Sequence, residues 1–336
     1  MQRFLLGDPS QVAVARREAV RIAQSTGFSE DDQARLAVVV TELSVNTIRH
    51  GGGGQMLFGR GVDDDGVQLE GLWLDKGPGM ADPAACLRDG FSTAGTPGNG
   101  FGAVQRMSDG FDCYSRVGQG TAVLARLRPG HAGPSAGAGQ ASRGWAIGAI
   151  VVPKAGELVS GDSWAVRPDG RSLCCMMVDG LGHGPQAAEA AAVAVAQFEA
   201  ATDIDPAAIL ERIHLAMRAT RGGAVAVLAI DTEVGSVRFS GVGNIAGVLL
   251  SAGMRRMVSH NGTAGGIAQR IRAFDYPRPA RAVAILHSDG LSANWTIDTY
   301  PGLASCDPTL IAGVLFRDQE RGRDDAAVLV VKELAA

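Results

Sequence analysis

Acidic residues next to glycine recur in the later part of the sequence, where they could bind a divalent cation. They lie in the motifs Ser-Gly-Asp, Val-Asp-Gly-Leu-Gly-His-Gly, His-Ser-Asp-Gly-Leu and Arg-Asp-Asp-Ala, which contain Asp162, Asp179, Asp289, Asp324 and Asp325. Carboxylate oxygens with few His or Cys residues nearby suit Mg²⁺ or Mn²⁺ better than Zn²⁺. Because Asp-Gly pairs are also common in turns, each motif alone indicates a turn more often than a ligand. Only their combination supports a metal site.

The earlier part of the sequence carries residues suited to a nucleotide. Glu42 and Asn46 are four residues apart and share one face of a predicted helix, where their oxygens could bind a hard cation or a polarised hydroxyl. Such a pair alone usually marks a solvated helix face. Downstream, Asp75-Lys76-Gly77-Pro78-Gly79 ends a predicted strand, and Gly98-Asn99-Gly100-Phe101-Gly102 opens a helix. Glycines allow close backbone approach and amides at a helix start favour phosphate, although either cluster taken singly indicates a turn.

Helices and strands must hold these residues in place. Before residue 129, periodicity predicts helices over 10–24, 29–50 and 102–109 and strands over 55–62, 67–74, 111–117 and 121–127. After residue 144 it predicts strands over 145–152, 163–167, 172–178, 224–230, 237–241, 247–250, 282–287 and 326–330, with helices over 185–201, 206–219 and 309–317. The expected class is therefore α+β.

The length and composition favour two domains. The 336 residues exceed what one core usually holds, since domains mostly have roughly 100 to 200 residues. Between them, residues 129–144 read PGHAGPSAGAGQASRG, which lacks the apolar side chains needed to order itself. We therefore predict a first domain over 1–128, a flexible linker over 129–144 and a second domain over 145–336.

Charge, hydropathy and cysteines exclude several classes of protein. The net charge of −4 gives no basic excess for nucleic acid, and no apolar run approaches the roughly 18 residues that span a bilayer. We expect a cytoplasmic protein. The odd number of cysteines without a CxxC spacing argues against a disulfide framework and against a zinc site; they are Cys86, Cys113, Cys174, Cys175 and Cys306.

Taken in order, the motifs of residues 8–128 resemble the four boxes of the gyrase, Hsp90 and histidine-kinase (GHKL) ATP-binding superfamily. The segments GFSEDDQARLAVVVTELSVN and DGFSTAGTPGNGFGAVQRMSD are similar to those of the RsbT-like serine kinases of bacterial stressosomes and anti-sigma systems. A histidine kinase would need a phosphoacceptor helix pair upstream, and only about ten residues precede the first predicted helix. The resemblance implies a Bergerat α/β sandwich that binds ATP and Mg²⁺.

The resemblance also implies a role for each matching residue. Asp75 would accept the adenine amino group, with Thr121 supporting that end of the site, and Asn46 would ligate the Mg²⁺ that bridges the phosphates. Glu42 would orient or deprotonate the attacking serine hydroxyl. The backbone would wrap the nucleotide at Gly77, Gly79, Gly100 and Gly102. One departure is that residues 96–102 do not form the usual Gly-Leu-Gly phosphate loop.

Residues 145–332 resemble the PP2C-type metal-dependent serine/threonine phosphatases, in their SpoIIE and RsbX branch, with VDGLGHGPQAAEAA as the most specific match. This resemblance implies an α-β-β-α sandwich with a two-metal centre held by Asp162, Asp179, the carbonyl of Gly180, Asp289 and Asp324, with Asp325 as the second choice for the last ligand. Beside the centre, His183 would donate a proton to the leaving oxygen or cap a glycine turn. Asn244 would shape the rim or simply form a turn.

The two resemblances together imply a bifunctional partner-switching regulator. It would phosphorylate a STAS-domain antagonist or scaffold with ATP and Mg²⁺, and dephosphorylate it with Mn²⁺ or Mg²⁺. The alternative is a nucleotide-dependent module without kinase activity that senses a signal or sequesters a sigma factor or downstream phosphatase, fused to an active phosphatase. The partner's identity, the metal used in the cell and the oligomeric state stay open.

Overall fold

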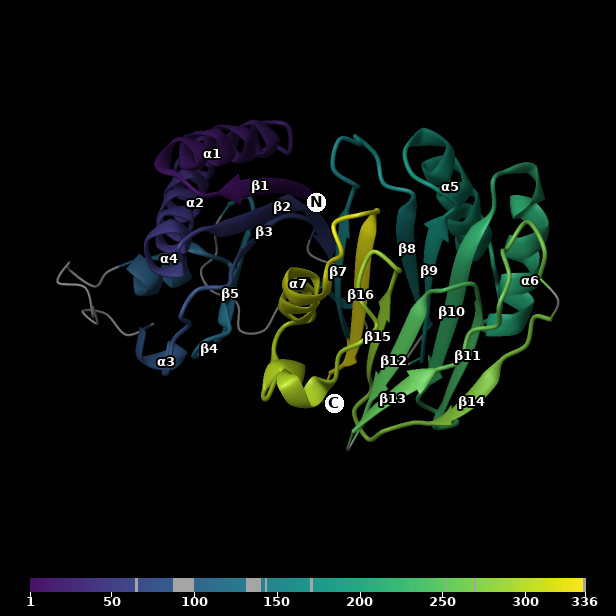
Figure 1. Ribbon diagram of the computed structural model, residues 1–336. Coiled ribbons are helices and arrows are strands. Elements are labelled where there is room, and N and C mark those ends of the chain that lie inside the picture. Colours follow the sequence, from purple (N-terminus) through teal and green to yellow (C-terminus); the bar gives the residue numbers. More distant parts are fainter. Residues whose placement is uncertain are drawn as a thin grey trace. The chain divides into compact units, whose positions relative to one another are not determined.

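The computed structural model describes residues 1–63, 66–86, 100–130, 140–142, 144–169, 172–251, 253–268 and 270–334. The chain forms two compact units (Figure 1). Unit 1 comprises Met1–Gln140 and Ser305–Arg317, and unit 2 comprises Ala141–Ala304 and Asp318–Ala336. Residues 305–317 thus group with unit 1, although they follow most of unit 2 in the sequence. Of the expected linker, residues 131–139 and 143 lie outside the described residues.

Unit 1 contains an antiparallel sheet with the order β1-β2-β3-β5-β4. Apolar side chains of two long helices form one core with this sheet, and Leu36, Val39 and Trp73 lie in it. The strands are β1 (Gln2–Leu6), β2 (Gly54–Asp63), β3 (Gly66–Asp75), β4 (Gly110–Arg116) and β5 (Gly120–Leu127). The helices are α1 (Pro9–Gln24), α2 (Glu30–Gly51), α3 (Pro83–Cys86) and α4 (Gly100–Met107).

Helix α2 begins and ends where its sequence predicts. Ser29 caps its start, because its hydroxyl oxygen accepts the Asp32 amide at 3.2 Å, and acidic residues fill the first turn. The helix ends at Gly52, whose φ of 71° is left-handed. The predicted range 29–50 is therefore confirmed to within a residue at each end, and α2 carries Glu42 and Asn46 on a rigid element.

Helix α7 (Pro308–Gln319) contributes Pro308–Arg317 to unit 1. Each of these ten residues is buried. A helix that is apolar on all sides is buried on all sides, so this segment is an interior element rather than a surface one.

Unit 2 contains two antiparallel sheets. The first has the order β14-β11-β10-β9-β8 and the second β13-β12-β15-β16-β7-β6. The first consists of β8 (Asp162–Asp169), β9 (Ser172–Gly180), β10 (Gly223–Asp231), β11 (Ser236–Val242) and β14 (Phe274–Pro277). The second consists of β6 (Gln140–Ser142), β7 (Trp145–Val152), β12 (Ala246–Leu250), β13 (Met254–Met257), β15 (Val283–His287) and β16 (Ala326–Glu333).

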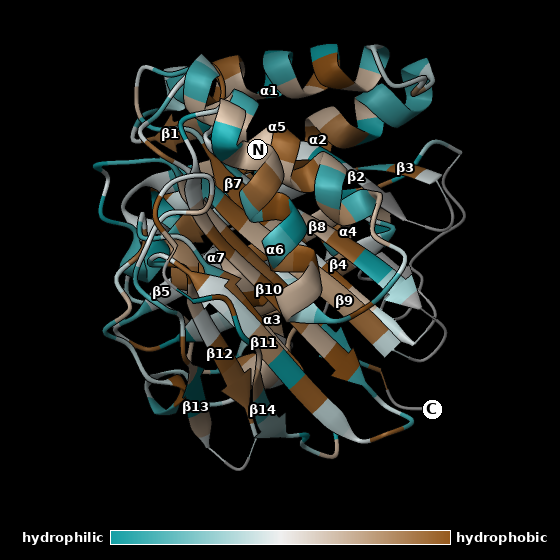
Figure 2. Cartoon of the chain, turned by 90° about the vertical axis from the view of Figure 1, so that its right-hand side faces the viewer, coloured by the Kyte–Doolittle hydropathy of each residue, from teal (hydrophilic) through white to brown (hydrophobic). Residues whose placement is uncertain are grey.

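Two cores hold the layers of unit 2 together. Met177 and Leu228 of the first sheet meet Leu286 and Leu329 of the second in one cluster, whereas α5 (Pro185–Glu199) and α6 (Pro206–Ala216) cover the other face of the first sheet. Strands β9 and β10 are covered on both faces, and Figure 2 shows apolar, brown residues along them. None of the helices that the structure describes is long and apolar enough to cross a membrane.

The α+β class and the predicted elements are confirmed, with ends that shift by one to three residues. Four strands were not predicted: β1, β6, β13 and β14. Of these, β6 lies within the range 129–144 that was expected to be a flexible linker. β13 has the sequence MRRM and β14 has FDYP, so charges and a proline hide them from a search for apolar alternation. Such residues are typical of edge strands, and both strands lie at sheet edges.

Candidate functional sites

The first candidate site centres on Asp75, the last residue of β3. Its Oδ1 accepts two backbone amides, from Gly77 at 2.9 Å and from Thr121 at 3.1 Å. Burial raises the pKa of this carboxyl, while the two amides and the charge of Arg317 oppose the rise. Asp75 and Thr121, which are 46 residues apart in the sequence, are thus brought together as predicted.

The turn that follows Asp75 packs so tightly that it requires glycine. A Cβ added at Gly77 would lie 2.6 Å from the Cα of Gly51, at the end of α2. At Gly79, where φ is 68°, a Cβ would lie 1.9 Å from the carbonyl oxygen of Arg116. Both glycines therefore allow the backbone to approach its neighbours within the protein. Their expected contact with a nucleotide stays a prediction.

Glu42 and Asn46 lie along α2, and neither belongs to its buried face of Leu43, Ser44 and Thr47. Glu42 is exposed and Asn46 is half-buried, so both are available to a ligand.

Gly100 and Gly102 lie in the first turn of α4. Gly98 and Asn99, from the same predicted phosphate loop, lie outside the described residues. The phosphate end of the site therefore stays a prediction.

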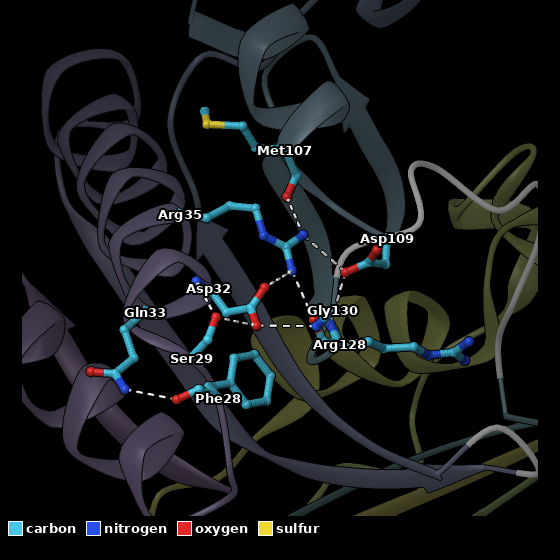
Figure 3. A network of polar contacts seen from close by, with 9 residues as sticks. All are labelled: Phe28, Ser29, Asp32, Gln33, Arg35, Met107, Asp109, Arg128 and Gly130. Carbon is cyan, nitrogen blue, oxygen red and sulfur yellow. Dashed lines mark hydrogen bonds and ion pairs between the residues drawn. The ribbon is translucent and has the colours of Figure 1, made fainter.

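A polar network around Arg35 fixes α4 to α2 (Figure 3). Its guanidinium donates to the carbonyl of Met107 at 2.9 Å and to the Asp109 carboxylate at 3.0 Å, at the end of α4. It also donates to the carbonyl of Arg128 at 2.7 Å and to Asp32 at 3.2 Å. Sequence reasoning missed this network, because three of the four partners lie 72 to 93 residues from Arg35.

The second candidate site lies in unit 2, where β8 and β9 place Asp162 opposite Asp179. The hydroxyl of Ser288 donates to Oδ2 of Asp162 at 2.6 Å and accepts the Ala327 amide at 3.0 Å. Ser288 therefore joins a carboxylate of the first sheet to the last strand of the second. The sequence carried a signal for this residue, since it stands in the His-Ser-Asp-Gly-Leu motif beside Asp289.

The remaining acidic residues of unit 2 take different partners. Asp289 accepts the side-chain amide of Asn244 at 2.6 Å, which brings together two residues predicted to share a rim. Asp325 uses both oxygens within the fold, because they accept the amides of Lys154 and Gly161, each at 2.7 Å. Asp324 accepts the Asp325 amide with only one oxygen, at 3.0 Å.

Burial and repulsion between like charges both raise the pKa values in this cluster. Burial and the charges of Asp289, Asp324 and Asp325 raise the pKa of Asp179 to about 7. Burial and Asp179 raise the pKa of Asp162 well above its usual range. A divalent cation would offset this repulsion. These pKa shifts show that the carboxylates lie close enough to repel one another. A set of donors that are all oxygens fits Mg²⁺ or Mn²⁺.

The described residues contain no group of three or more His, Cys, Asp or Glu side chains already arranged to hold a metal. Asp162, Asp289 and Asp325 each turn an oxygen toward a partner within the protein. The backbone at Gly180 is closely packed, since a Cβ there would lie 2.3 Å from the carbonyl oxygen of Ala187. A Cβ added at Gly161 would lie 3.3 Å from the carbonyl oxygen of Gly180 and 3.1 Å from Oδ2 of Asp325, so this carbonyl lies near that carboxylate.

His183 follows this turn and contacts a carboxylate that sequence reasoning missed. Its Nδ1 lies 2.6 Å from Oε1 of Glu157. The side chains are 44% and 27% exposed, so the imidazole is accessible while one ring nitrogen is held.

Family models match both units. Residues 5–127 match the model described as histidine kinase-like ATPase domain, and residues 169–333 match stage II sporulation protein E (SpoIIE). Serine/threonine-protein kinase RsbT of Bacillus subtilis (strain 168) is 34% identical over 114 residues, which cover 34% of this chain and 86% of RsbT. Phosphoserine phosphatase RsbX of the same organism is 29% identical over 141 residues, which cover 41% of this chain and 71% of RsbX. The chain is a fusion of these two families.

A solved structure is similar to part of the chain. It is described as the bacterial stressosome, a modular system adapted to control secondary messenger signaling. It is 26% identical with a TM-score of 0.52, and the match covers 56% of this chain and 98% of that one. The RsbT-type domain thus contains the Asp75 site, and the SpoIIE-type PP2C phosphatase domain contains the acidic cluster. The predicted resemblance to both families is confirmed.

Proposed function

We propose that the chain is a bifunctional partner-switching regulator. The RsbT-type domain transfers a phosphate from ATP to a serine or threonine of a STAS-domain protein, and the SpoIIE-type domain hydrolyses the phosphoester. The observation that carries this proposal is the homology of one chain to a named serine/threonine-protein kinase and to a named phosphoserine phosphatase. Opposed activities on one chain let the phosphorylation level of the partner follow the ratio of two rates.

In the kinase site, the proposed roles combine the family resemblance with the places of these residues in unit 1. Asp75, held by the amides of Gly77 and Thr121, accepts the adenine amino group. Asn46 ligates the Mg²⁺ that accompanies ATP. Glu42 is exposed on the same helix one turn earlier, where it can orient the hydroxyl or take its proton.

In the phosphatase site, Asp162, Asp179, Asp289, Asp324 and the carbonyl of Gly180 are the proposed ligands of Mn²⁺ or Mg²⁺. Asp324 is preferred over Asp325, because both oxygens of Asp325 already accept backbone amides. When bound, such cations supply positive charge to the phosphate and lower the pKa of a water molecule. Ser288 and Asn244 orient Asp162 and Asp289 for this role.

The contact with Glu157 favours His183 as a proton donor over a simple turn cap. A carboxylate 2.6 Å from Nδ1 fixes the orientation of the ring. A histidine held in this way can donate a proton from its other ring nitrogen to the leaving serine oxygen.

Transfer of labelled phosphate tests the kinase assignment. The full chain is incubated with radiolabelled ATP and a candidate STAS protein, and Glu42→Ala is compared with Glu42→Gln and with Asp31→Ala, an exposed acid on the same helix. We expect Glu42→Ala to abolish transfer and to keep nucleotide affinity. Glu42→Gln should keep part of the transfer if Glu42 orients the hydroxyl, and none if it removes the proton.

The alternative is a nucleotide-dependent sensor or anti-sigma module without kinase activity. It is distinguished by its products. The sensor predicts release of phosphate from the phosphorylated STAS protein with no labelling from ATP under any condition. Labelling that requires Glu42 excludes it.

A further inference from the structure

The helix segment Ser305–Arg317 belongs to unit 1 although it lies far outside the matched ATPase domain. The family match ends at residue 127, and the residues on both sides of the segment belong to unit 2. The segment therefore needs its own explanation within unit 1.

A buried ion network anchors the start of the segment to the sheet. Arg126 of β5 is 3% exposed and pairs with Glu70 of β3 at 2.7 Å and with Asp307 at 2.6 Å. The same guanidinium bonds the second oxygen of Asp307 at 2.8 Å and the hydroxyl of Thr309 at 2.9 Å, and the Asp307 amide donates to Asp112 at 2.7 Å. A bidentate contact of this kind between a guanidinium and a carboxylate fixes the relative orientation of the two groups as well as their distance.

Further along, α7 contacts strands β3 and β1 through an apolar contact and a cation–π contact. A Cβ added at Gly313 would lie 3.1 Å from Leu72 and 3.4 Å from Leu74, so the helix lies against the end of β3. One turn on, the guanidinium of Arg3 lies 5.0 Å from the centre of the Phe316 ring. The helix therefore runs toward Asp75, the last residue of β3.

At its end the helix reaches the nucleotide site. Arg317 is 6% exposed, and its Nη1 donates to the main-chain oxygen of Asp75 at 3.1 Å. The side chain of the same residue accepts the amides of Gly77 and Thr121. The buried guanidinium of Arg317 thus holds the main chain of Asp75, whose side chain is the proposed adenine-binding carboxylate.

We propose that Arg317 is a positioning residue for the nucleotide site, which fixes Asp75 to read the adenine amino group. The proposal rests on the ATP-binding role proposed for unit 1. Arg317 does not touch the nucleotide: it holds the Asp75 peptide and adds a positive charge that favours the ionised, accepting form of the carboxylate. Unit 1 is therefore completed by a residue that lies outside the ATPase family match, within the residues that match SpoIIE.

Nucleotide binding to the full chain tests the proposal. Arg317→Met removes the donor and the charge but keeps an unbranched apolar side chain, Arg317→Lys keeps the charge, and Arg281→Met alters an exposed arginine of unit 2 as the control. A fluorescent ATP analogue is bound and then displaced by ATP, GTP or inorganic tripolyphosphate. We expect Arg317→Met to weaken ATP about tenfold, since bonds to charged groups commonly contribute that much, to reduce the preference for ATP over GTP, and to leave tripolyphosphate unchanged. Arg317→Lys should retain part of the preference.

The outcomes separate the inference from the proposed function on which it rests. If the unsubstituted chain does not bind the analogue, the proposed ATP site fails and the inference fails with it. If it binds and Arg317→Met keeps both affinity and base preference, the inference alone is wrong. Equal losses for ATP and tripolyphosphate would indicate a general structural role and also overturn it. A thermal melt accompanies each variant, and Arg317→Lys decides the case if Arg317→Met does not fold.

Discussion

The two candidate sites both place aspartates at strand ends beside glycine, yet they balance negative charge in different ways. In unit 1 a single carboxylate, Asp75, receives two amides and the charge of Arg317. In unit 2 the carboxylates face one another, so that burial and repulsion act together on Asp179. Burial and the charge of Asp324 also raise the pKa of Asp289, and the nearby charge of Arg321 offsets only part of this rise. In the first site, hydrogen-bond donors of the protein balance the carboxylate, whereas in the second a bound cation would balance the repelling carboxylates.

The largest expected effect comes from replacing Asp179 by asparagine, which should affect the site in unit 2 and leave the site in unit 1 unchanged. Loss of a residue that merely orients a metal ligand commonly reduces affinity or activity about 10- to 100-fold, so loss of a proposed ligand should exceed about 100-fold. We expect Asp179→Asn to lose nearly all hydrolysis of a phosphorylated STAS protein and most of its Mn²⁺ affinity, while labelling from ATP stays intact.

The matched control for that experiment is Asp275→Asn. Asp275 is an exposed aspartate of β14, with a side chain 82% exposed, and it should affect neither activity. Equal loss of kinase and phosphatase activity in Asp179→Asn would contradict two separate sites.

Ser288→Ala should produce a smaller effect at the same site. The hydroxyl of Ser288 joins Asp162 to the amide of Ala327, so the variant removes an orienting bond and keeps the proposed ligands. We expect Mn²⁺ affinity to fall about 10- to 100-fold and excess Mn²⁺ to restore most of the hydrolysis rate. Titration of activity with Mn²⁺ measures this, with the exposed Ser251→Ala as the control; a loss that no Mn²⁺ concentration restores would assign Ser288 a different role.

The sequence was sufficient for the fold class, and it pointed to residues that the structure brings together at each candidate site, because these residues stand in local motifs. Asp75, Asp179 and Asp289 stand in short motifs whose glycines shape the turns around them, and turns are encoded within a few residues. Arg317 could not be found in this way. Its partner lies 242 residues away, and an arginine near the end of a helix is ordinarily a charge that interacts with the helix dipole. A contact that depends on how a distant helix packs leaves no short motif in the sequence around Arg317.

The pH dependence of stability should report the repulsion among the buried carboxylates of unit 2. The folded pKa of Asp179 is raised to about 7 from an ordinary value near 4, so the folded state binds more protons than the unfolded state between about pH 4 and 7. Stability in chelator should therefore decrease as the pH rises through that window. Asp162 is shifted in the same direction.

Thermal melts in chelator across that window test this expectation. Asp179→Asn should flatten the decrease and raise the melting temperature at pH 8, because the neutral amide removes one of the repelling charges. Added Mn²⁺ should do the same for the unsubstituted chain. A steeper decrease in the variant would show that Asp179 is not the group under strain.

Ser29→Ala should give the smallest effect, and in the opposite direction. The Ser29 hydroxyl accepts the amide of Asp32 at the start of α2 and donates to its carboxylate at 2.8 Å. Loss of such a cap costs about 1 kcal/mol, which corresponds to a decrease of roughly 2 to 4 °C in the melting temperature of a unit of this size. Because Ser29 lies at the opposite end of α2 from Asn46, both activities should stay unchanged at 25 °C. A chain destabilised by Ser29→Ala and stabilised by Asp179→Asn at pH 8 would show that unit 1 is held by satisfied polar groups, whereas unit 2 without metal retains unbalanced charge. A loss of kinase activity in Ser29→Ala would instead mean that the α2 cap and the Arg35 network reach the nucleotide site.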